Sequence, residues 1–107
     1  MVHSDIVKKI HELPTPCLVV DLDRFEANLE KMSRFTRERN VALRPHSKTH
    51  KCVNIARRQL EKGAIGICAA TIAEAEMMLR AGIRGLLITG EMAGEPDRKS
   101  TRLNSSH

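Results

Sequence analysis

The chain has 107 residues, of which 41% are hydrophobic and 29% are charged, and it carries a net charge of +5. This length suits a single small domain, and this balance is typical of a folded soluble protein rather than a disordered chain. No apolar run approaches the roughly 18 residues that cross a bilayer, and the charged amino terminus does not resemble a signal peptide, so we expect a cytoplasmic protein without membrane partners.

The composition also argues against several binding classes. Three of the 18 Lys and Arg residues, but one of the 13 Asp and Glu residues, lie in residues 97–107, so the positive excess of the remainder is small. With two Phe and no Trp or Tyr, the chain lacks the aromatic platforms on which single-strand binders stack bases, and we expect no nucleic-acid partner. The three cysteines have no C-x-x-C spacing, which supports neither a disulfide framework nor a zinc ribbon.

The first predicted elements are a strand and a helix. CLVVD, residues 17–21, is a short apolar run between Pro16 and an acidic turn, which predicts a buried strand. A helix is predicted from Asp23, which forms a capping-box pattern with Glu26. Its apolar positions recur at helical spacing and predict a buried face: Phe25, Leu29, Met32 and Phe35.

The rest of the chain alternates strands and helices. Thr71 with Glu74 forms a second capping box, and Gly63 and Gly82 are placed as helix stops. The predicted elements are, in order, a strand at 41–44 that Pro45 disturbs, a helix at 51–62, a strand at 64–69, a helix after Thr71 with Ala75, Met78 and Leu79 buried, and a strand at 85–89.

Strands recurring every twenty-odd residues with a helix between them predict βαβ units and a parallel sheet, so the fold class is α/β. Two architectures use this repeat, an open doubly wound sheet and a closed (β/α)8 TIM-type barrel, and periodicity alone does not choose between them. No G-x-G-x-x-G follows the first strand, where VDLDRF stands instead, so the dinucleotide-binding signature is absent.

The most basic stretch is RPHSKTHK, residues 44–51, in which five of eight side chains are Arg, Lys or His. If the strand stays extended, alternation places four of them on one face: Arg44, His46, Lys48 and His50. Such a face is costly to bury without an anion, which predicts a phosphate-bearing ligand. The stretch follows a strand, and ligands of α/β folds gather at the carboxyl ends of strands.

Lys48 is the candidate nucleophile of this stretch. An ordinary lysine, with a pKa of about 10.4, is protonated at neutral pH. Neighbouring positive charge and partial burial lower such a pKa, and a neutral amine can condense with an aldehyde to a Schiff base. Lys51 is offset to the other side, where we expect solvent or a phosphate as its partner. No metal site is predicted here, because ligation by His46 and His50 would need a helix that Pro45 disfavours.

A family resemblance covers roughly residues 13–94 and is carried by the segments TPCLVVDLDRFEANLEKM, LRPHSKTHK, GICAATIAEAEMMLRAG and LLITGEM. These segments resemble the amino-terminal region of the D-threonine aldolase and D-serine dehydratase family, whose members are pyridoxal-phosphate enzymes on an alanine-racemase-like barrel. R-P-H-x-K-T-H-K is the most specific element. The resemblance implies that Lys48 holds pyridoxal 5'-phosphate, that the fold is a (β/α)8 barrel followed by a β domain, and that residues 17–21 pair with that later domain.

The resemblance further implies a lyase that acts on small D-β-hydroxy amino acids, by retro-aldol cleavage of D-threonine or dehydration of D-serine. Strand geometry alone assigns four further residues to the cofactor site: Arg44, His46, Thr49 and His50. The family's divalent metal, zinc or manganese, is held by a His and Cys pair in a later domain that does not map onto this chain. We also expect the parent protein to be a homodimer.

Two alternatives stay open. The parent could be an amino acid racemase of the alanine-racemase type or a non-catalytic carrier of pyridoxal phosphate on the same barrel, which a full-length sequence without the His and Cys metal pair would favour. The basic stretch could instead be a nucleic-acid-contacting loop without a cofactor, which would bind with a steep dependence on salt.

The end of the chain, DRKSTRLNSSH at residues 97–107, has no apolar period and predicts a disordered tail. It also resembles, at every position, the in-frame translation of a widely used sequencing-adapter oligonucleotide. We therefore expect residues 1–96 to be an amino-terminal fragment of the barrel, truncated after about four strands, and residues 97–107 to be non-native. Because four strands cannot close an eight-stranded barrel, the fragment itself is predicted to be inactive.

Overall fold

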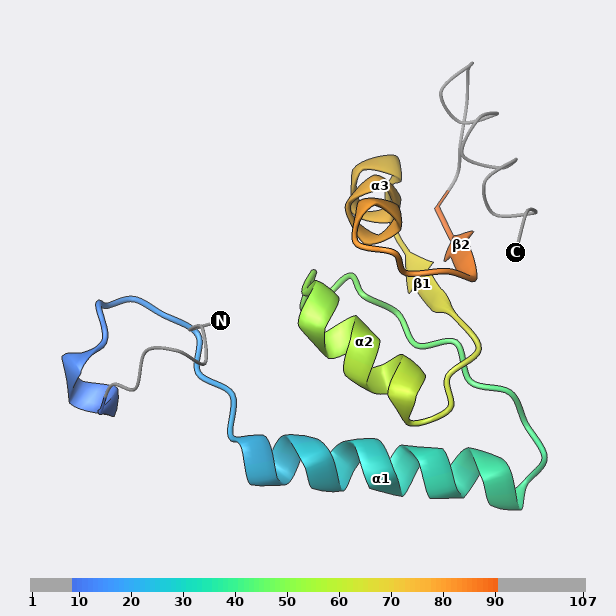
Figure 1. Ribbon diagram of the computed structural model, residues 1–107, viewed down its shortest axis with the longest axis horizontal. Helices are drawn as coiled ribbons and strands as arrows, with labels where there is room; N and C mark the ends of the chain where they lie inside the picture. The colour runs from blue at the N-terminus through green and yellow to red at the C-terminus, as the bar shows by residue number, and fades with distance from the viewer. Residues whose placement is uncertain (1–8, 91–107) are drawn as a thin grey trace.

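The computed structural model describes residues 9–90, which end in a parallel βαβ unit (Figure 1). Strands β1 (Ile67–Ala69) and β2 (Leu86–Ile88) pair in parallel, and helix α3 (Ile72–Arg80) connects them. The predicted parallel sheet is therefore confirmed, although each strand is shorter than its predicted range. The predicted tail at residues 97–107 lies outside the described residues.

A third segment, residues 43–47, runs along the other edge of β1 without becoming a strand. His46 forms an isolated parallel bridge with Cys68, whose N–H donates to the Pro45 carbonyl over 2.8 Å. A further bridge towards the amino terminus would need an N–H on Pro45, and proline has none. The strand predicted at 41–44 is therefore wrong in the described structure, and one bridge stands in its place.

The amino-terminal elements also depart from prediction. The short helix η1 (Ile10–Glu12) is followed by residues 13–20, which lie far from the sheet in Figure 1 and join no ladder. The strand predicted at 17–21 is wrong for the described residues, because no described strand lies beside it to satisfy its backbone. Leu18 is 94% exposed, so the apolar run that suggested a buried strand faces outward here.

Helix α1 (Leu22–Glu38) begins one residue before the predicted start. Its N-cap is Asp21, whose carboxylate accepts from the Arg24 N–H over 3.1 Å, rather than Asp23. The predicted apolar face is only partly covered, since Met32 is 48% exposed and Phe35 is 51% exposed. That face therefore lacks a complete partner within the part of the chain that the structure describes.

Helix α2 (Val53–Glu61) lies above α1 in Figure 1 and is tied to it by polar contacts. The Ser33 hydroxyl donates to the Lys62 carbonyl over 2.7 Å. The predicted start of the helix at residue 51 is wrong, because Lys51 has a φ of +47° and lies outside the helix. Gly63, with a φ of +104°, ends α2 as predicted.

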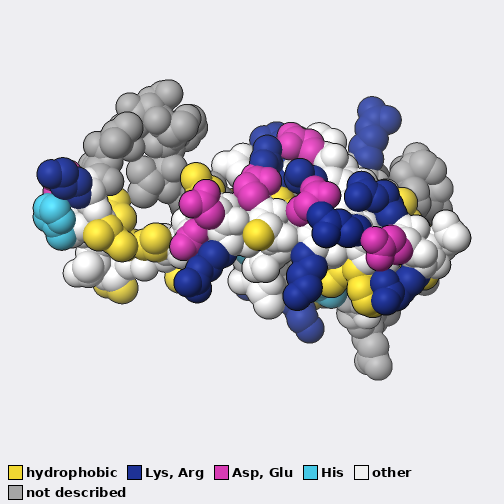
Figure 2. All heavy atoms as spheres, turned by 90° about the horizontal axis from the view of Figure 1, so that it is seen from below, with side chains coloured by type: hydrophobic (Ala, Val, Ile, Leu, Met, Phe, Trp, Pro, Cys, Tyr) yellow, Lys and Arg dark blue, Asp and Glu magenta, His cyan; other side chains and the backbone are white. Residues whose placement is uncertain are grey.

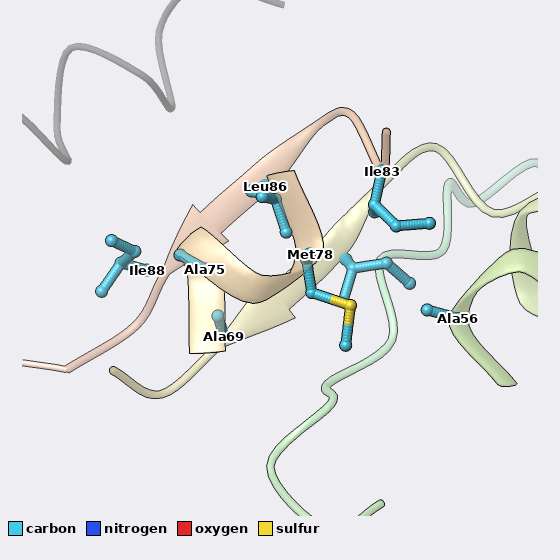
Figure 3. Packing of buried hydrophobic residues seen from close by; sticks show 8 residues of the cluster. Ala56, Ala69, Ala75, Met78, Ile83, Leu86 and Ile88 are labelled. Atoms are coloured by element: carbon cyan, nitrogen blue, oxygen red, sulfur yellow. The ribbon is translucent and has the colours of Figure 1, made fainter. Parts of the chain in front are cut away.

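The hydrophobic core lies where α2 and α3 cover one face of the sheet (Figure 3). The buried cluster consists of Ala56, Ile67, Ala69, Ala75, Met78, Ile83, Leu86 and Ile88. As predicted, Thr71 caps α3 by accepting from the Glu74 N–H over 3.2 Å, and α3 ends before Gly82. Ala75 and Met78 form its buried stripe, which Leu79 extends as a half-buried neighbour.

The opposite face of the sheet is the one that matters for the site. Because side chains alternate along a strand, the residues between the core positions of β1 and β2 point away from the helices. Cys68 and Leu87 are paired on that face, and Leu87 is exposed. His46 joins the same row through its bridge to Cys68. Among the described residues, no helix is long and apolar enough to cross a membrane.

Candidate functional site

Arg44 and His46 lie on the face of the sheet that points away from the helices, but they contact opposite ends of β2. The Arg44 guanidinium donates to the Gly85 carbonyl over 2.5 Å, immediately before the strand. The His46 ring lies 2.9 Å from the Thr89 hydroxyl, immediately after the strand. The structure therefore brings His46 to the carboxyl ends of the strands and places Arg44 at the amino end, away from the predicted ligand position.

The chain stops being extended at Ser47. This residue is fully buried, and its N–H and hydroxyl both donate to the Cys68 carbonyl, over 2.9 and 3.1 Å. A turn follows, closed by a bond of 2.8 Å from the Lys51 N–H to the Ser47 carbonyl. The prediction that four alternate side chains share one face is therefore wrong beyond His46, because the buried Ser47 redirects the backbone.

Lys48 begins this turn. Its side chain is exposed, so the partial burial expected from the sequence is not found among residues 9–90. Within the same residues, its ammonium has no ion-pair partner. Its N–H donates to Nδ1 of His46 over 3.1 Å. Thr49 is also exposed in the turn, on the solvent side of the described residues.

Lys51 has a partner that the sequence did not reveal. Its ammonium lies 3.9 Å from Oε1 of Glu74, a carboxylate that is largely buried. The other carboxylate oxygen accepts from the Ala70 N–H over 2.9 Å. The expectation of solvent or phosphate as the partner of Lys51 is therefore corrected. The sequence did mark Glu74 as part of the cap of α3. It did not show that Lys51, 23 positions earlier, would contact this carboxylate.

His50 turns towards α2 instead of joining His46. Its Nδ1 accepts from the Cys52 N–H over 2.9 Å, and its Nε2 is buried without a hydrogen-bond partner in the described structure. Burial lowers the pKa of His50 below its ordinary value of 6.5, and the neighbouring Gln59 amide partly offsets this. His50 is therefore neutral at pH 7 and adds no positive charge to the turn.

This lowered pKa predicts a pH-dependent stability. Because the unfolded chain binds a proton at His50 more readily than the folded chain, stability is highest above pH 6.5 and falls as the pH drops below that value. Thermal unfolding midpoints measured from pH 8 to pH 5 should show this fall, and His50→Gln should reduce it. His11→Gln, at an exposed position, is the matched control and should leave the slope unchanged. Equal slopes in all three proteins would contradict the assignment.

The charges of the surface are paired and mixed. Figure 2 shows Lys and Arg side chains interleaved with Asp and Glu over the face that carries α1. Arg58 pairs there with Glu26, and Lys62 lies 3.3 Å from Glu30. This face therefore presents no continuous basic stripe of the kind that follows a nucleic-acid backbone.

Comparisons with known proteins identify the family. The family model described as "Alanine racemase, N-terminal domain" matches residues 20–104. Over 80 residues the chain is 50% identical to a D-threonine aldolase of an Arthrobacter species, covering 75% of this chain and 21% of that protein. It is 42% identical over 81 residues to a D-threo-3-hydroxyaspartate dehydratase of Delftia sp. strain HT23, covering 76% of this chain and 21% of the relative.

Solved structures agree with these matches. The crystal structure of D-threonine aldolase from Filomicrobium marinum has a TM-score of 0.77 at 47% identity, covering 79% of this chain and 23% of that one. D-threo-3-hydroxyaspartate dehydratase from Delftia sp. HT23 has a TM-score of 0.79 at 37% identity, covering 88% and 25%. The chain spans about a fifth of the length of the curated relatives it matches. The predicted family resemblance and the barrel fold class are confirmed: the chain belongs to the alanine racemase N-terminal domain family, and the described residues form part of its TIM-barrel-like fold.

Proposed function

We propose that the chain is the amino-terminal part of a longer pyridoxal-phosphate lyase that acts on D-β-hydroxy amino acids. The names of its relatives, an aldolase and a dehydratase, support this reaction class. The observation that carries the proposal is the position of Lys48. Its amine projects from a turn at the carboxyl ends of parallel strands, where α/β folds bind ligands, and it has no ion-pair partner among residues 9–90.

The described residues fit one end of the cofactor. Covalent attachment to an aldehyde requires an accessible amine, and the exposed, unpaired Lys48 offers one. At the phosphate end, Arg44 lies at the amino end of β2, where it donates to Gly85, and the Lys51 ammonium faces Glu74. We therefore infer that the phosphate is held by residues outside 9–90, and that Arg44 orders the sheet instead of binding the cofactor.

When bound, pyridoxal phosphate supplies an electron sink for negative charge at the substrate α-carbon. The contribution of this chain is placement and proton transfer. Lys48 Nζ would bind the cofactor covalently and be released when the substrate amino group takes its place. The freed amine would then move a proton at the substrate α-carbon. His46, through the Lys48 N–H, would help to orient this amine.

Product analysis on the full-length protein tests this proposal. With D-threonine, cleavage of the bond between the α- and β-carbons gives glycine and acetaldehyde; with D-serine, loss of water followed by hydrolysis of the resulting imine gives a 2-oxo acid and ammonia. We expect one of these pairs, together with a yellow, cofactor-loaded protein. Racemisation of alanine without either product would favour the racemase alternative, and bound cofactor without turnover would favour the non-catalytic carrier.

The finer attributes of the parent protein stay predictions. We propose a divalent metal, zinc or manganese, held by residues outside this chain, and the description of a cysteine variant of a D-threo-3-hydroxyaspartate dehydratase as metal-free is consistent with a metal in that relative. Loss of turnover on chelation, restored by either ion, would test this. We also propose a cytoplasmic homodimer that binds neither nucleic acid nor membranes, which sedimentation and a salt titration with DNA would check.

The 107-residue polypeptide alone is expected to show no lyase turnover. Its described residues supply two paired strands, whereas a barrel closes with eight, and its large apolar side chains Leu18 and Leu22 are exposed. The purified polypeptide, supplied with pyridoxal phosphate and D-threonine, should give no more acetaldehyde than a Lys48→Arg version of itself. Turnover above that background would contradict the expectation.

A further inference from the structure

His46 connects the segment before the Lys48 turn to the ends of β1 and β2. Its Nδ1 accepts from the Lys48 N–H over 3.1 Å, and its Nε2 lies 2.9 Å from the Thr89 hydroxyl beyond β2. The Thr89 oxygen lies in turn 3.4 Å from the carbonyl of Ala69, the last residue of β1. One imidazole ring therefore bridges the segment before the turn to the ends of both strands.

These contacts fix the tautomer of His46. A backbone N–H can only donate, so the Nδ1 that faces the Lys48 N–H must be the unprotonated, accepting nitrogen. The neutral ring then carries its proton on Nε2, which donates to the Thr89 hydroxyl. The hydroxyl keeps its own proton for the Ala69 carbonyl. The hydrogen bonds therefore all run the same way, from the Lys48 N–H through His46 and Thr89 to the Ala69 carbonyl.

We propose that His46 is a positioning residue whose neutral Nε2–H tautomer holds the backbone of Lys48 against the end of β2. Other contacts fix the ends of the turn: Ser47 is bound to Cys68, and the Lys51 N–H is bound to Ser47. Lys48 itself is held by the ring of His46. The link to cofactor capture rests on the proposed function of Lys48, whereas the link to backbone order does not.

Two near-isosteric substitutions distinguish the contact made by Nδ1 of His46 from the contact made by its Nε2. In His46→Asn, the amide oxygen can take the place of Nδ1 and accept from the Lys48 N–H. In His46→Gln, the longer side chain can reach Thr89, but its acceptor no longer lies beside Lys48. Asparagine should therefore preserve the positioning contact, and glutamine should lose it, although both are neutral amides of similar polarity.

The first readout is hydrogen exchange at the Lys48 amide in the full-length protein without cofactor. We expect His46→Gln to accelerate it about fivefold to tenfold, as for loss of one ordinary hydrogen bond, and His46→Asn to change it about twofold or less. Exchange at the buried Ser47 should stay unchanged in both variants, which shows that the fold is intact. Equal exchange at Lys48 in wild type, Asn and Gln proteins would overturn the proposal.

The second readout is the rate at which added pyridoxal phosphate attaches to the protein, followed by absorbance and located by borohydride reduction. This rate should fall about fivefold or more in His46→Gln and recover in His46→Asn. If reduction labels a lysine other than Lys48 in the wild type, the proposed function fails, and amide exchange still decides the role of His46. If Lys48 is labelled but both variants capture cofactor at the wild-type rate, the positioning role in capture is wrong.

Discussion

Replacing Lys48 with arginine in the full-length protein is expected to abolish covalent cofactor binding and to lower lyase turnover at least about a thousandfold. Arginine keeps the positive charge and most of the length of the side chain, but its guanidinium does not deprotonate in proteins and cannot condense with an aldehyde. Because the Lys48 side chain is exposed and unpaired among residues 9–90, the substitution should not disturb the fold.

Borohydride reduction followed by peptide mapping measures the first half of this prediction, and acetaldehyde release from D-threonine measures the second. Lys51→Arg is the matched control, three positions along the same turn. Its partner is Glu74, so an arginine there keeps the ion pair and should retain both label and turnover. A label on any lysine other than Lys48, or full turnover by Lys48→Arg, would end the proposal that this amine carries the chemistry.

Met78→Ala is expected to lower the free energy of unfolding by about 2–5 kcal/mol. Met78 is fully buried at the centre of the cluster in Figure 3, where α3 packs on the sheet, so its truncation leaves a cavity that rigid neighbours cannot fill. Urea unfolding followed by circular dichroism, with the slope of the transition compared between proteins, gives the change.

The adjacent Met77→Ala is the control for this substitution. Met77 has the same chemistry and helix propensity but packs half-buried against the edge of the cluster, so its truncation should cost less than half as much. If the two substitutions destabilise the protein equally, the core is not organised around Met78 as described.

The elements predicted correctly are those specified by local sequence. Helix α3 has its cap at Thr71, its buried Met78 stripe and its stop at Gly82 within a dozen residues, and all three are found. The parallel pairing of β1 with β2 follows from the helix between them, because a strand, helix and strand in succession favour a parallel pair. Local propensity and tertiary packing agree in this region, so the sequence alone predicts both the helix and the strand pairing.

The predictions that failed depend on partners far away in the chain. An apolar run such as residues 17–21 becomes a strand only beside another strand, and none of the described strands lies next to it. The helix cap moved from Asp23 to Asp21 because both aspartates suit the position, and only the backbone path distinguishes them. Composition shows that a segment is apolar or can cap a helix, but it does not show what stands opposite.

In the candidate site, too, the local contacts were predicted and the distant ones were not. The sequence predicted Lys48 near His46, and the structure brings them together through the backbone. It did not predict that Arg44 would be engaged by Gly85, since that contact spans 41 positions. Nor did it predict that the buried Ser47 would end the alternation and turn His50 towards the helix. A pattern of alternate basic residues indicates one face only while the backbone remains extended.

The missing N–H of Pro45 has a wider consequence for how this edge tolerates change. With one bridge in place of a ladder, residues 43–47 are aligned against β1 by the backbone hydrogen bonds at Pro45 and Ser47, and the Ser47 hydroxyl and the His46 ring add to them. Elsewhere in a sheet most residues can be exchanged without altering which amide faces which carbonyl. Here two side chains contribute to that alignment, so their replacement would loosen the register of this edge as well as change its chemistry.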